Sequence, residues 1–266
     1  MTHLYHKITG KGPDLVLLHG WGFNSEVWQV VISLLQSHFR ITVLDLPGFG
    51  RSSWHVEHYH LEAITEAILP FLPQKAAYLG WSLGGLIATQ IALNYPERVE
   101  LLVNVCSTPC FLQKEDWPGI SPAVFQKFIK FAKIKPARLL FDFLKMQFPL
   151  DESKTWFFQF LKESLFRFGE PPTTVLINSL ICLKDADLRS AVRQLKVPFY
   201  YIFGTADVIV PFEITEKITN YIASDKIKSI NSGHLPFFNL DPFFFSLLSQ
   251  CLGLSPLIKK REALAQ

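Results

Sequence analysis

The sequence has few cysteines, little net charge and no long apolar run, and each shortage excludes a class of protein. Its 266 residues include 4 cysteines, none with the paired spacing of a zinc site. The formal net charge is +3 and no run of five or more lysines and arginines occurs, so nothing indicates a nucleic-acid partner. No segment reaches the roughly 18 uninterrupted apolar residues that a membrane-spanning helix requires.

The start of the chain and its thiols favour a cytoplasmic protein. The first 14 residues contain no apolar stretch of signal-peptide length, so we expect an unsecreted, soluble chain with no membrane partner. The four cysteines lie in apolar or loop surroundings, and we expect reduced thiols. His55, His58 and His60 are close in sequence, but no matching carboxylate or cysteine pattern accompanies them. We therefore predict no metal site.

What the sequence does contain is a repeated pattern of short apolar runs, each followed by turn residues and then by a helical pattern. With 49% apolar residues, the chain is long enough to form one sizeable core. The alternation predicts an α/β fold with a mostly parallel sheet flanked by helices, and such sheets bind ligands at the carboxyl ends of their strands. The predicted strands cover residues 15–18, 41–44, 76–79, 101–105, 197–203 and 226–230.

The strand pattern is interrupted in the middle of the chain. From residue 111 to 189 the sequence is typical of helices rich in Phe, Leu and Lys, and Ser121-Pro122 has the form of a helix start with the serine as N-cap. We therefore predict one core made of residues 1–110 and 190–266, with a helical cap inserted at 111–189. We expect the protein to be a monomer.

One strand-end loop carries a serine in a pattern that is typical of nucleophilic catalysis. Gly80-Trp81-Ser82-Leu83-Gly84 fits G-x-S-x-G, a tight strand-to-helix turn that holds the serine hydroxyl out at the edge of the sheet. The pattern alone is common, but here a predicted strand precedes it and a good helix pattern follows at 85–93. A serine hydroxyl is a poor nucleophile near neutral pH, so it needs a base, and the base needs an acid that fixes its tautomer.

Two later strand ends supply that base and that acid. Asp207 follows the strand predicted at 197–203, and His234 follows the strand predicted at 226–230. A single Asp or His in a loop is usually incidental, but Ser, Asp and His in this order match the α/β-hydrolase fold. We therefore predict a catalytic triad of Ser82, Asp207 and His234. The main-chain N–H groups of Leu83 and Trp21 are the candidate donors to the oxyanion.

Further motifs narrow the choice among such enzymes. The tryptophan before Ser82 and the segment Trp117-Pro118-Gly119-Ile120 are less widely shared than the elbow itself. With His19-Gly20-Trp21-Gly22, they make the chain resemble the pimeloyl-[acyl-carrier protein] methyl ester esterases of bacterial biotin synthesis, which are carboxylesterases of the α/β-hydrolase superfamily. The resemblance continues through residues 45–52, 90–93, 96–99 and 109–111.

This resemblance implies an activity and a set of substrate contacts. The activity is hydrolysis of the methyl ester of a pimeloyl chain carried on acyl-carrier protein, with no cofactor. The implied contacts in the core are Trp21, Ser82, Leu83 and His234. The implied contacts in the cap are Phe143, Leu144, Lys145, Met146 and Gln147.

The cap also has an uneven charge balance. Between residues 127 and 145, six basic side chains are accompanied by one acidic residue, Asp142, which leaves a local net charge of +5. Acyl-carrier proteins are acidic, so this cluster would steer one toward the active-site mouth, although an ordinary solvated helix face has the same composition. The candidate partner-binding residues are Lys127, Lys130, Lys133 and Arg138.

Two other functions stay open from the sequence. A general short-chain carboxylesterase, or a hydrolase of carbon–carbon bonds, would share the fold and the triad, because these do not fix the substrate. A non-catalytic receptor for an acyl chain or a signalling molecule would use the same pocket without turnover. The complete Ser82, Asp207 and His234 set argues against the receptor.

Overall fold

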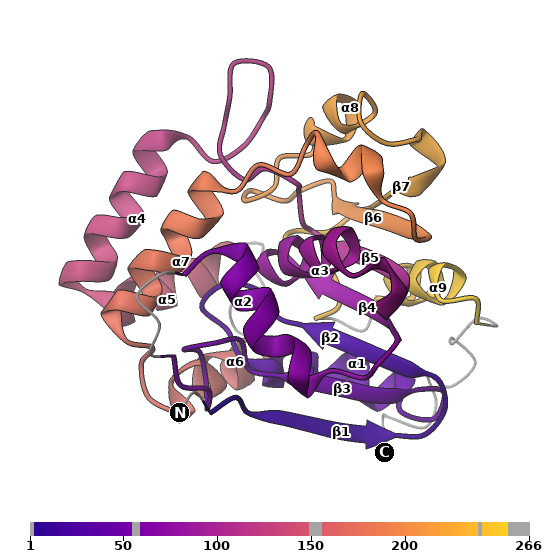
Figure 1. Cartoon of the computed structure of the whole chain (residues 1–266). Coiled ribbons are helices and arrows are strands. Elements are labelled where there is room, and N and C mark those ends of the chain that lie inside the picture. Colours follow the sequence, from indigo (N-terminus) through magenta and orange to yellow (C-terminus); the bar gives the residue numbers. More distant parts are fainter. Residues whose placement is uncertain (1–2, 55–58, 149–155, 239–240, 255–266) are drawn as a thin grey trace.

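A computed structural model describes residues 3–54, 59–148, 156–238 and 241–254 of the chain. Its seven strands form one sheet in the order β1-β3-β2-β4-β5-β6-β7, in which β1 is antiparallel to β3 and all other neighbours are parallel (Figure 1). The predicted α/β sheet is therefore confirmed. The strands are β1 (His6–Gly10), β2 (Asp14–Leu18), β3 (Arg40–Leu44), β4 (Ala76–Trp81), β5 (Val99–Val105), β6 (Phe199–Gly204) and β7 (Ile227–Ile230).

Strand β1 is the one that the sequence pattern did not reveal. Its residues HKITG are mostly exposed, so they lack the apolar run by which the other six strands were recognised. The strand forms because it pairs along the whole of β3, from His6 opposite Leu44 to Gly10 opposite Arg40. Backbone hydrogen bonding at the sheet edge, not burial of side chains, decides this element.

Helices cover both faces of the sheet. On one face, α3 is buried along nearly its whole length and packs against β4 and β5, with α2 beside it. On the other face, the Phe237 ring stacks on Trp28 at 4.7 Å and meets Phe244 at 6.0 Å, which ties the start of α1 to α9. The core helices are α1 (Gln29–Leu35), α2 (Leu61–Ile68), α3 (Leu83–Asn94), α8 (Ile214–Ile218) and α9 (Pro242–Cys251).

Four helices between β5 and β6 gather beyond the carboxyl ends of the strands (Figure 1). As predicted, Ser121 caps the first of them, and its hydroxyl accepts a hydrogen bond from the Val124 N–H at 3.4 Å. The chain leaves and re-enters the core at neighbouring points, because the Leu188 N–H donates to the Pro109 carbonyl at 2.7 Å. The helices are α4 (Pro122–Ile134), α5 (Pro136–Met146), α6 (Trp156–Arg167) and α7 (Thr173–Asp185).

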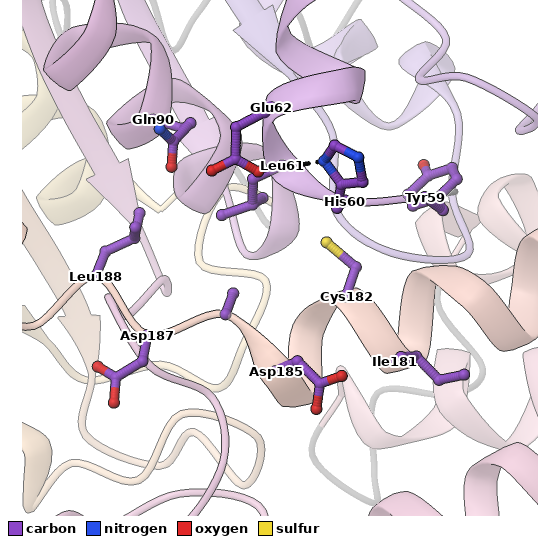
Figure 2. A pocket seen from close by; sticks show the side chains of 11 residues that line it. Tyr59, His60, Leu61, Glu62, Gln90, Ile181, Cys182, Asp185, Asp187 and Leu188 are labelled. Atoms are coloured by element: carbon purple, nitrogen blue, oxygen red, sulfur yellow. Dashed lines mark hydrogen bonds and ion pairs between the residues drawn. The ribbon is translucent and has the colours of Figure 1, made fainter. Parts of the chain in front are cut away.

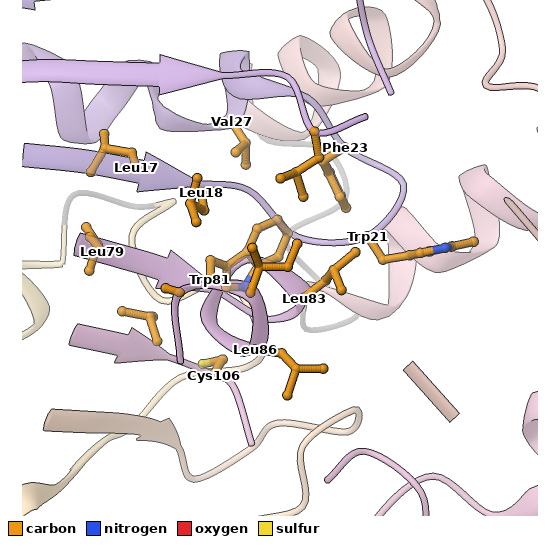
Figure 3. Packing of buried hydrophobic residues seen from close by; sticks show 14 of the residues in the cluster. Leu17, Leu18, Trp21, Phe23, Val27, Leu79, Trp81, Leu83, Leu86 and Cys106 are labelled. Atoms are coloured by element: carbon orange, nitrogen blue, oxygen red, sulfur yellow. The ribbon is translucent and has the colours of Figure 1, made fainter. Parts of the chain in front are cut away.

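The apolar core continues from the sheet up to its carboxyl edge. Leu17 and Leu18 of β2, Leu79 of β4 and Leu83 of α3 lie in one buried cluster with Trp81 (Figure 3). The loops that follow these strands are therefore anchored on a packed base. Within the described part of the chain, no helix has the length and apolar character needed to cross a bilayer.

Candidate active site

The structure brings together the three residues that the sequence predicted as a triad. His234 Nε2 lies 2.9 Å from Ser82 Oγ, and His234 Nδ1 lies 2.7 Å from Asp207 Oδ2. All three are buried, with His234 completely inaccessible. The geometry provides a hydroxyl, a base within hydrogen-bonding reach of it, and a carboxylate that orients the base.

Ser82 lies on a strained turn between β4 and α3. Its φ of 54° and ψ of −120° lie outside the regions that side chains favour. Two contacts from the end of β5 hold this conformation. The Ser82 N–H donates to the Val105 carbonyl at 3.0 Å, and the Ser107 hydroxyl donates to the Ser82 carbonyl at 2.7 Å. The turn is therefore fixed from both sides, as a nucleophile elbow requires.

The loops after β6 and β7 orient the other two members. The Asp207 Oδ1 atom accepts hydrogen bonds from the N–H groups of Ile209 at 2.8 Å and Val210 at 3.0 Å, which leaves Oδ2 for His234. The indole Nε1 of Trp81 donates to the His234 carbonyl at 2.7 Å. Trp81, the residue before Ser82, thus holds the loop that carries His234.

The loop after β2 carries Trp21, the second candidate oxyanion donor. A Cβ added to Gly20 would lie 3.2 Å from Ser82 Cβ, so this loop lies directly against the elbow. Leu83 is the first residue of α3, where main-chain N–H groups have no helical partner. In the described part of the chain, neither the Trp21 nor the Leu83 N–H donates to a main-chain carbonyl. Both are available to a developing oxyanion.

His19 fixes this loop as a neutral side chain. Its Nε2 accepts a hydrogen bond from the Leu46 N–H at 2.8 Å, so the proton lies on Nδ1 and is donated to the Gly20 carbonyl at 2.8 Å. Burial lowers the pKa of His19 from 6.5 to about 4, against the opposing charge of Asp45. The neutral imidazole joins the loop after β2 to the loop after β3.

Asp45 anchors the loop after β3. Its carboxylate is fully buried and accepts hydrogen bonds from the Ser25 hydroxyl at 2.6 Å and from Arg51 Nε at 2.7 Å. Burial acts to raise the pKa of Asp45, but the hydrogen bonds from Arg51 and Ser25 and the neighbouring His19 outweigh it, so the pKa lies below its usual value. The carboxylate therefore stays charged and holds its partners.

Comparison with known proteins agrees with this geometry. The sequence profile of the alpha/beta hydrolase fold matches residues 13–239. The chain belongs to the α/β-hydrolase fold family. The elbow, the Ser-Asp-His order and the buried triad are those of a serine hydrolase of this family.

Individual relatives within this family carry a more specific name. The Pectobacterium carotovorum protein named pimeloyl-[acyl-carrier protein] methyl ester esterase is 40% identical over 239 residues, which cover 89% of this chain and 93% of the relative. The Yersinia enterocolitica protein of the same name is 38% identical, with 93% and 96% covered. An esterase from Exiguobacterium antarcticum has a similar structure, with a TM-score of 0.81 and 25% identity over 94% of this chain and 96% of that one. The resemblance predicted from the motifs is confirmed.

The cap segment with the implied substrate contacts divides into two groups. The Phe143 ring meets the Trp21 ring edge to face at 5.0 Å, and Leu144 and Gln147 are buried. Lys145 and Met146 are exposed at the surface. Of the five implied cap contacts, Phe143, Leu144 and Gln147 are therefore turned into the protein, whereas Lys145 and Met146 face solvent.

The candidate partner-binding residues form an exposed basic face on the first two cap helices. Lys127, Lys130 and Lys133 lie on α4, and Arg138 lies on α5, where it pairs with Asp142 at 2.7 Å. An open groove of about 460 Å³ runs along α4 between Lys127, Lys130 and apolar side chains such as Ile134, which is 62% exposed.

Cys106 is a residue near the triad that the sequence analysis missed. It directly follows β5, and its sulfur and the nearest ligand atoms of Asp207 and His234 all lie within 4.8 Å of one another. Burial and the Asp207 charge raise the pKa of the thiol, so it stays protonated and is a poor metal ligand. The signal that could have identified it is its position directly after a central strand, at the edge of the sheet where the site was predicted. Of the histidines weighed above, His55 and His58 lie outside the described residues.

A second cavity lies apart from the triad, between the start of α2 and the end of α7 (Figure 2). It measures about 340 Å³ and is lined by several acidic side chains. These have partners: Glu62 contacts His60 at 3.2 Å, and Asp187 pairs with Arg189 at 2.8 Å. Asp185 pairs with Lys184 at 2.8 Å, so each of the three acidic side chains that line the cavity has a partner.

Proposed function

We propose that this serine hydrolase cleaves the methyl ester of a pimeloyl chain carried on acyl-carrier protein, in bacterial biotin synthesis. The observation that carries the proposal is the buried triad, with His234 at 2.9 Å from Ser82 and 2.7 Å from Asp207, in a chain whose relatives bear that name. The fold and triad alone would equally suit a general short-chain carboxylesterase. The relatives' name favours the carrier-bound ester.

The acylation step follows from the hydrogen bonds of the triad. His234 Nε2 removes the proton from Ser82 Oγ as that oxygen attacks the ester carbonyl carbon. The main-chain N–H groups of Leu83 and Trp21 hold the resulting oxyanion. The carbon–oxygen bond to the methoxy group then breaks, and His234 gives its proton to the departing methanol. Asp207 stabilises the charged imidazole throughout.

Deacylation repeats the step with water. His234 takes a proton from a water molecule whose oxygen attacks the acyl-serine, the bond to Ser82 Oγ breaks, and the proton returns to that oxygen. The products are a free carboxylic acid and the original enzyme. Every proton is carried by His234, so the reaction needs neither a metal nor a cofactor.

The exposed basic face of α4 and α5 supports an acidic protein partner. Lys127 and Lys130 line the groove along α4, and Lys133 is exposed on the same helix, so an acidic carrier would meet several positive charges at once. Such charges raise the rate of encounter, and salt screens them. Arg138 contributes less, because Asp142 neutralises it.

The proposal includes a core formed by residues 1–110 and 190–266, with the cap at 111–189, and a monomer that acts in the cytoplasm. The bond from Leu188 to Pro109 supports the boundaries. All four cysteines are unpaired thiols, which suits a reducing compartment. Gel filtration at micromolar concentration checks the monomer.

The deciding experiment is methanol release from the pimeloyl-carrier methyl ester, measured for the wild type and for Ser82→Ala beside a short free methyl ester. We expect rapid release from the carrier substrate, a strong preference for it, and a loss of roughly 10⁴-fold or more in Ser82→Ala. Activity confined to the free ester would reduce the assignment to a general esterase. No serine-dependent release from either ester would favour a receptor.

A further inference from the structure

We propose that Ser179, on cap helix α7, is a positioning residue for ester hydrolysis and that it acts through Trp21. The indole Nε1 of Trp21 donates a hydrogen bond to the Ser179 hydroxyl at 2.8 Å, across 158 positions of sequence. Both side chains are buried, with exposed fractions of 1% for Trp21 and 0% for Ser179. The inference rests on the proposed role of the Trp21 main-chain N–H as an oxyanion donor.

The Ser179 hydroxyl is a fixed acceptor. Its oxygen lies 2.6 Å from the Val175 carbonyl one turn earlier, so its own proton is donated there and a lone pair remains for Trp21. A serine that bonds back to its own helix has little rotational freedom. The position of the acceptor is therefore set by the backbone of α7 and not by a mobile side chain.

Helix α7 meets the core at a second point on the same face. Val175 lies one turn from Ser179 and packs against Gly48, in the loop that follows β3. A Cβ at Gly48 would lie 2.6 Å from Val175 Cγ2, and the φ of this glycine is +79°. Helix α7 thus rests on the loops after β2 and β3 together, and the hydrogen bond to Trp21 sets their position relative to the cap.

A buried tryptophan in this fold does not always have a hydrogen-bond partner for its indole nitrogen, so the bond from Trp21 to Ser179 is a specific feature. Among the described residues, the indole nitrogens of Trp28 and Trp54 are buried without any partner, so the fold tolerates such a loss elsewhere. The Trp21 ring also meets Phe143 of α5 at 5.0 Å and 88°. A ring held at its nitrogen and along its edge has one position. Fixing the ring restricts the main chain of Trp21, whose N–H is the proposed oxyanion donor.

The test is Ser179→Ala, assayed as kcat and KM on a p-nitrophenyl ester of a short acid, with active sites counted by titration. Alanine is a better helix former than serine, so α7 is not weakened. We expect kcat to fall about tenfold and KM to change by less than about twofold, because a misdirected oxyanion donor acts on the transition state alone. A role limited to cap packing would instead raise KM or lower the titre.

The short ester separates this test from the proposal that the substrate is carried on acyl-carrier protein. Any esterase can hydrolyse the short ester, whether or not it recognises a carrier. Ser249→Ala is the matched control, because the Ser249 hydroxyl makes the same bond to the Phe245 carbonyl, at 2.6 Å, on core helix α9. We expect it to keep the wild-type kcat.

A double-mutant cycle completes the test. Trp21→Phe removes the indole donor, so adding Ser179→Ala to it should change kcat by less than about twofold. A wild-type kcat in Ser179→Ala, a raised KM in its place, or effects that multiply in the double variant would overturn the proposal.

Discussion

The carboxyl edge of the sheet and the outer face of the cap both carry polar residues of the proposed reaction, but they are built in opposite ways. At the sheet edge, Ser82, Asp207 and His234 are buried and joined by hydrogen bonds of 2.7 and 2.9 Å. On the cap, Lys127 and Lys130 extend into solvent. Buried polar groups need partners and keep one geometry, whereas exposed charges act at a distance and are screened.

This difference predicts two kinds of sensitivity. Changes at the sheet edge should alter the chemical step or the stability of the fold, and they should respond to pH. Changes on the cap face should alter only the encounter with a charged partner, and they should respond to salt. Variants from each region, taken from the largest expected effect to the smallest, can sharpen or break the comparison.

Asp207→Asn should have the largest effect. The Asn oxygen can still accept from Ile209 and Val210, but its amide would point N–H groups at His234 and favour the wrong tautomer. We expect kcat on any ester to fall by about 10³- to 10⁴-fold. Asp225→Asn, at an exposed aspartate that pairs with Lys226, is the control and should keep its activity. A loss below tenfold would mean that the carboxylate does not orient the base.

His19 should make the fold sensitive to acid. Its pKa is 6.5 when unfolded and about 4 when folded, so the unfolded chain binds the extra proton between these values and stability falls as the pH falls through them. Between pH 6.5 and 4.5 the loss amounts to about 2 kcal/mol. Asp45, with a lowered pKa, contributes only at still lower pH. Urea unfolding at pH 6.5 and 4.5 measures the effect. If the free energy of unfolding of His19→Gln falls equally between these pH values, the pH dependence comes from other groups.

Reversing charge on the cap should slow the carrier-bound substrate alone. In Lys130→Glu with Arg138→Glu, we expect kcat/KM for the carrier ester to fall about tenfold at low salt, and the loss to shrink as salt is added. Turnover of a short free ester should not change. Lys75→Glu is the control. Lys75 is exposed just before the start of β4, whereas Ser82 follows the other end of that strand. Equal losses on both esters would show that the cap residues act on the chemistry.

Cys106→Ala should have the smallest effect. The thiol packs beside Asp207 and His234, and the sulfur lies 3.7 Å from the Gly233 carbonyl, within range of a weak hydrogen bond. Loss of one such contact, worth about 0.5–1 kcal/mol, should lower kcat by about 2- to 5-fold. Cys106→Ser keeps a donor and should lose less. A larger loss in the serine variant would point to the volume of the sulfur as the determinant.

The catalytic edge was largely predictable, and the cap was predictable only in outline. Six strands and the triad followed from apolar runs that end in loops, because parallel strands bring their carboxyl ends to one edge. Strand β1 was missed, since its exposed residues carry no such pattern. In the cap, Trp156 and Phe157 are neighbouring apolar residues of α6, yet Trp156 is 66% exposed and Phe157 is buried, because an apolar helix pattern does not say which neighbour covers each face.

By itself, the sequence determined the order of the strands along the chain, the serine elbow, the acid and base that follow it, and the basic character of the cap. These are local: each depends on a short run of residues and on turn chemistry. Only the tertiary structure decided which distant groups meet, such as the Trp21 indole with Ser179 and the Cys106 thiol with Asp207. Such contacts depend on how helices and loops pack in three dimensions, and no spacing along one chain encodes that distance.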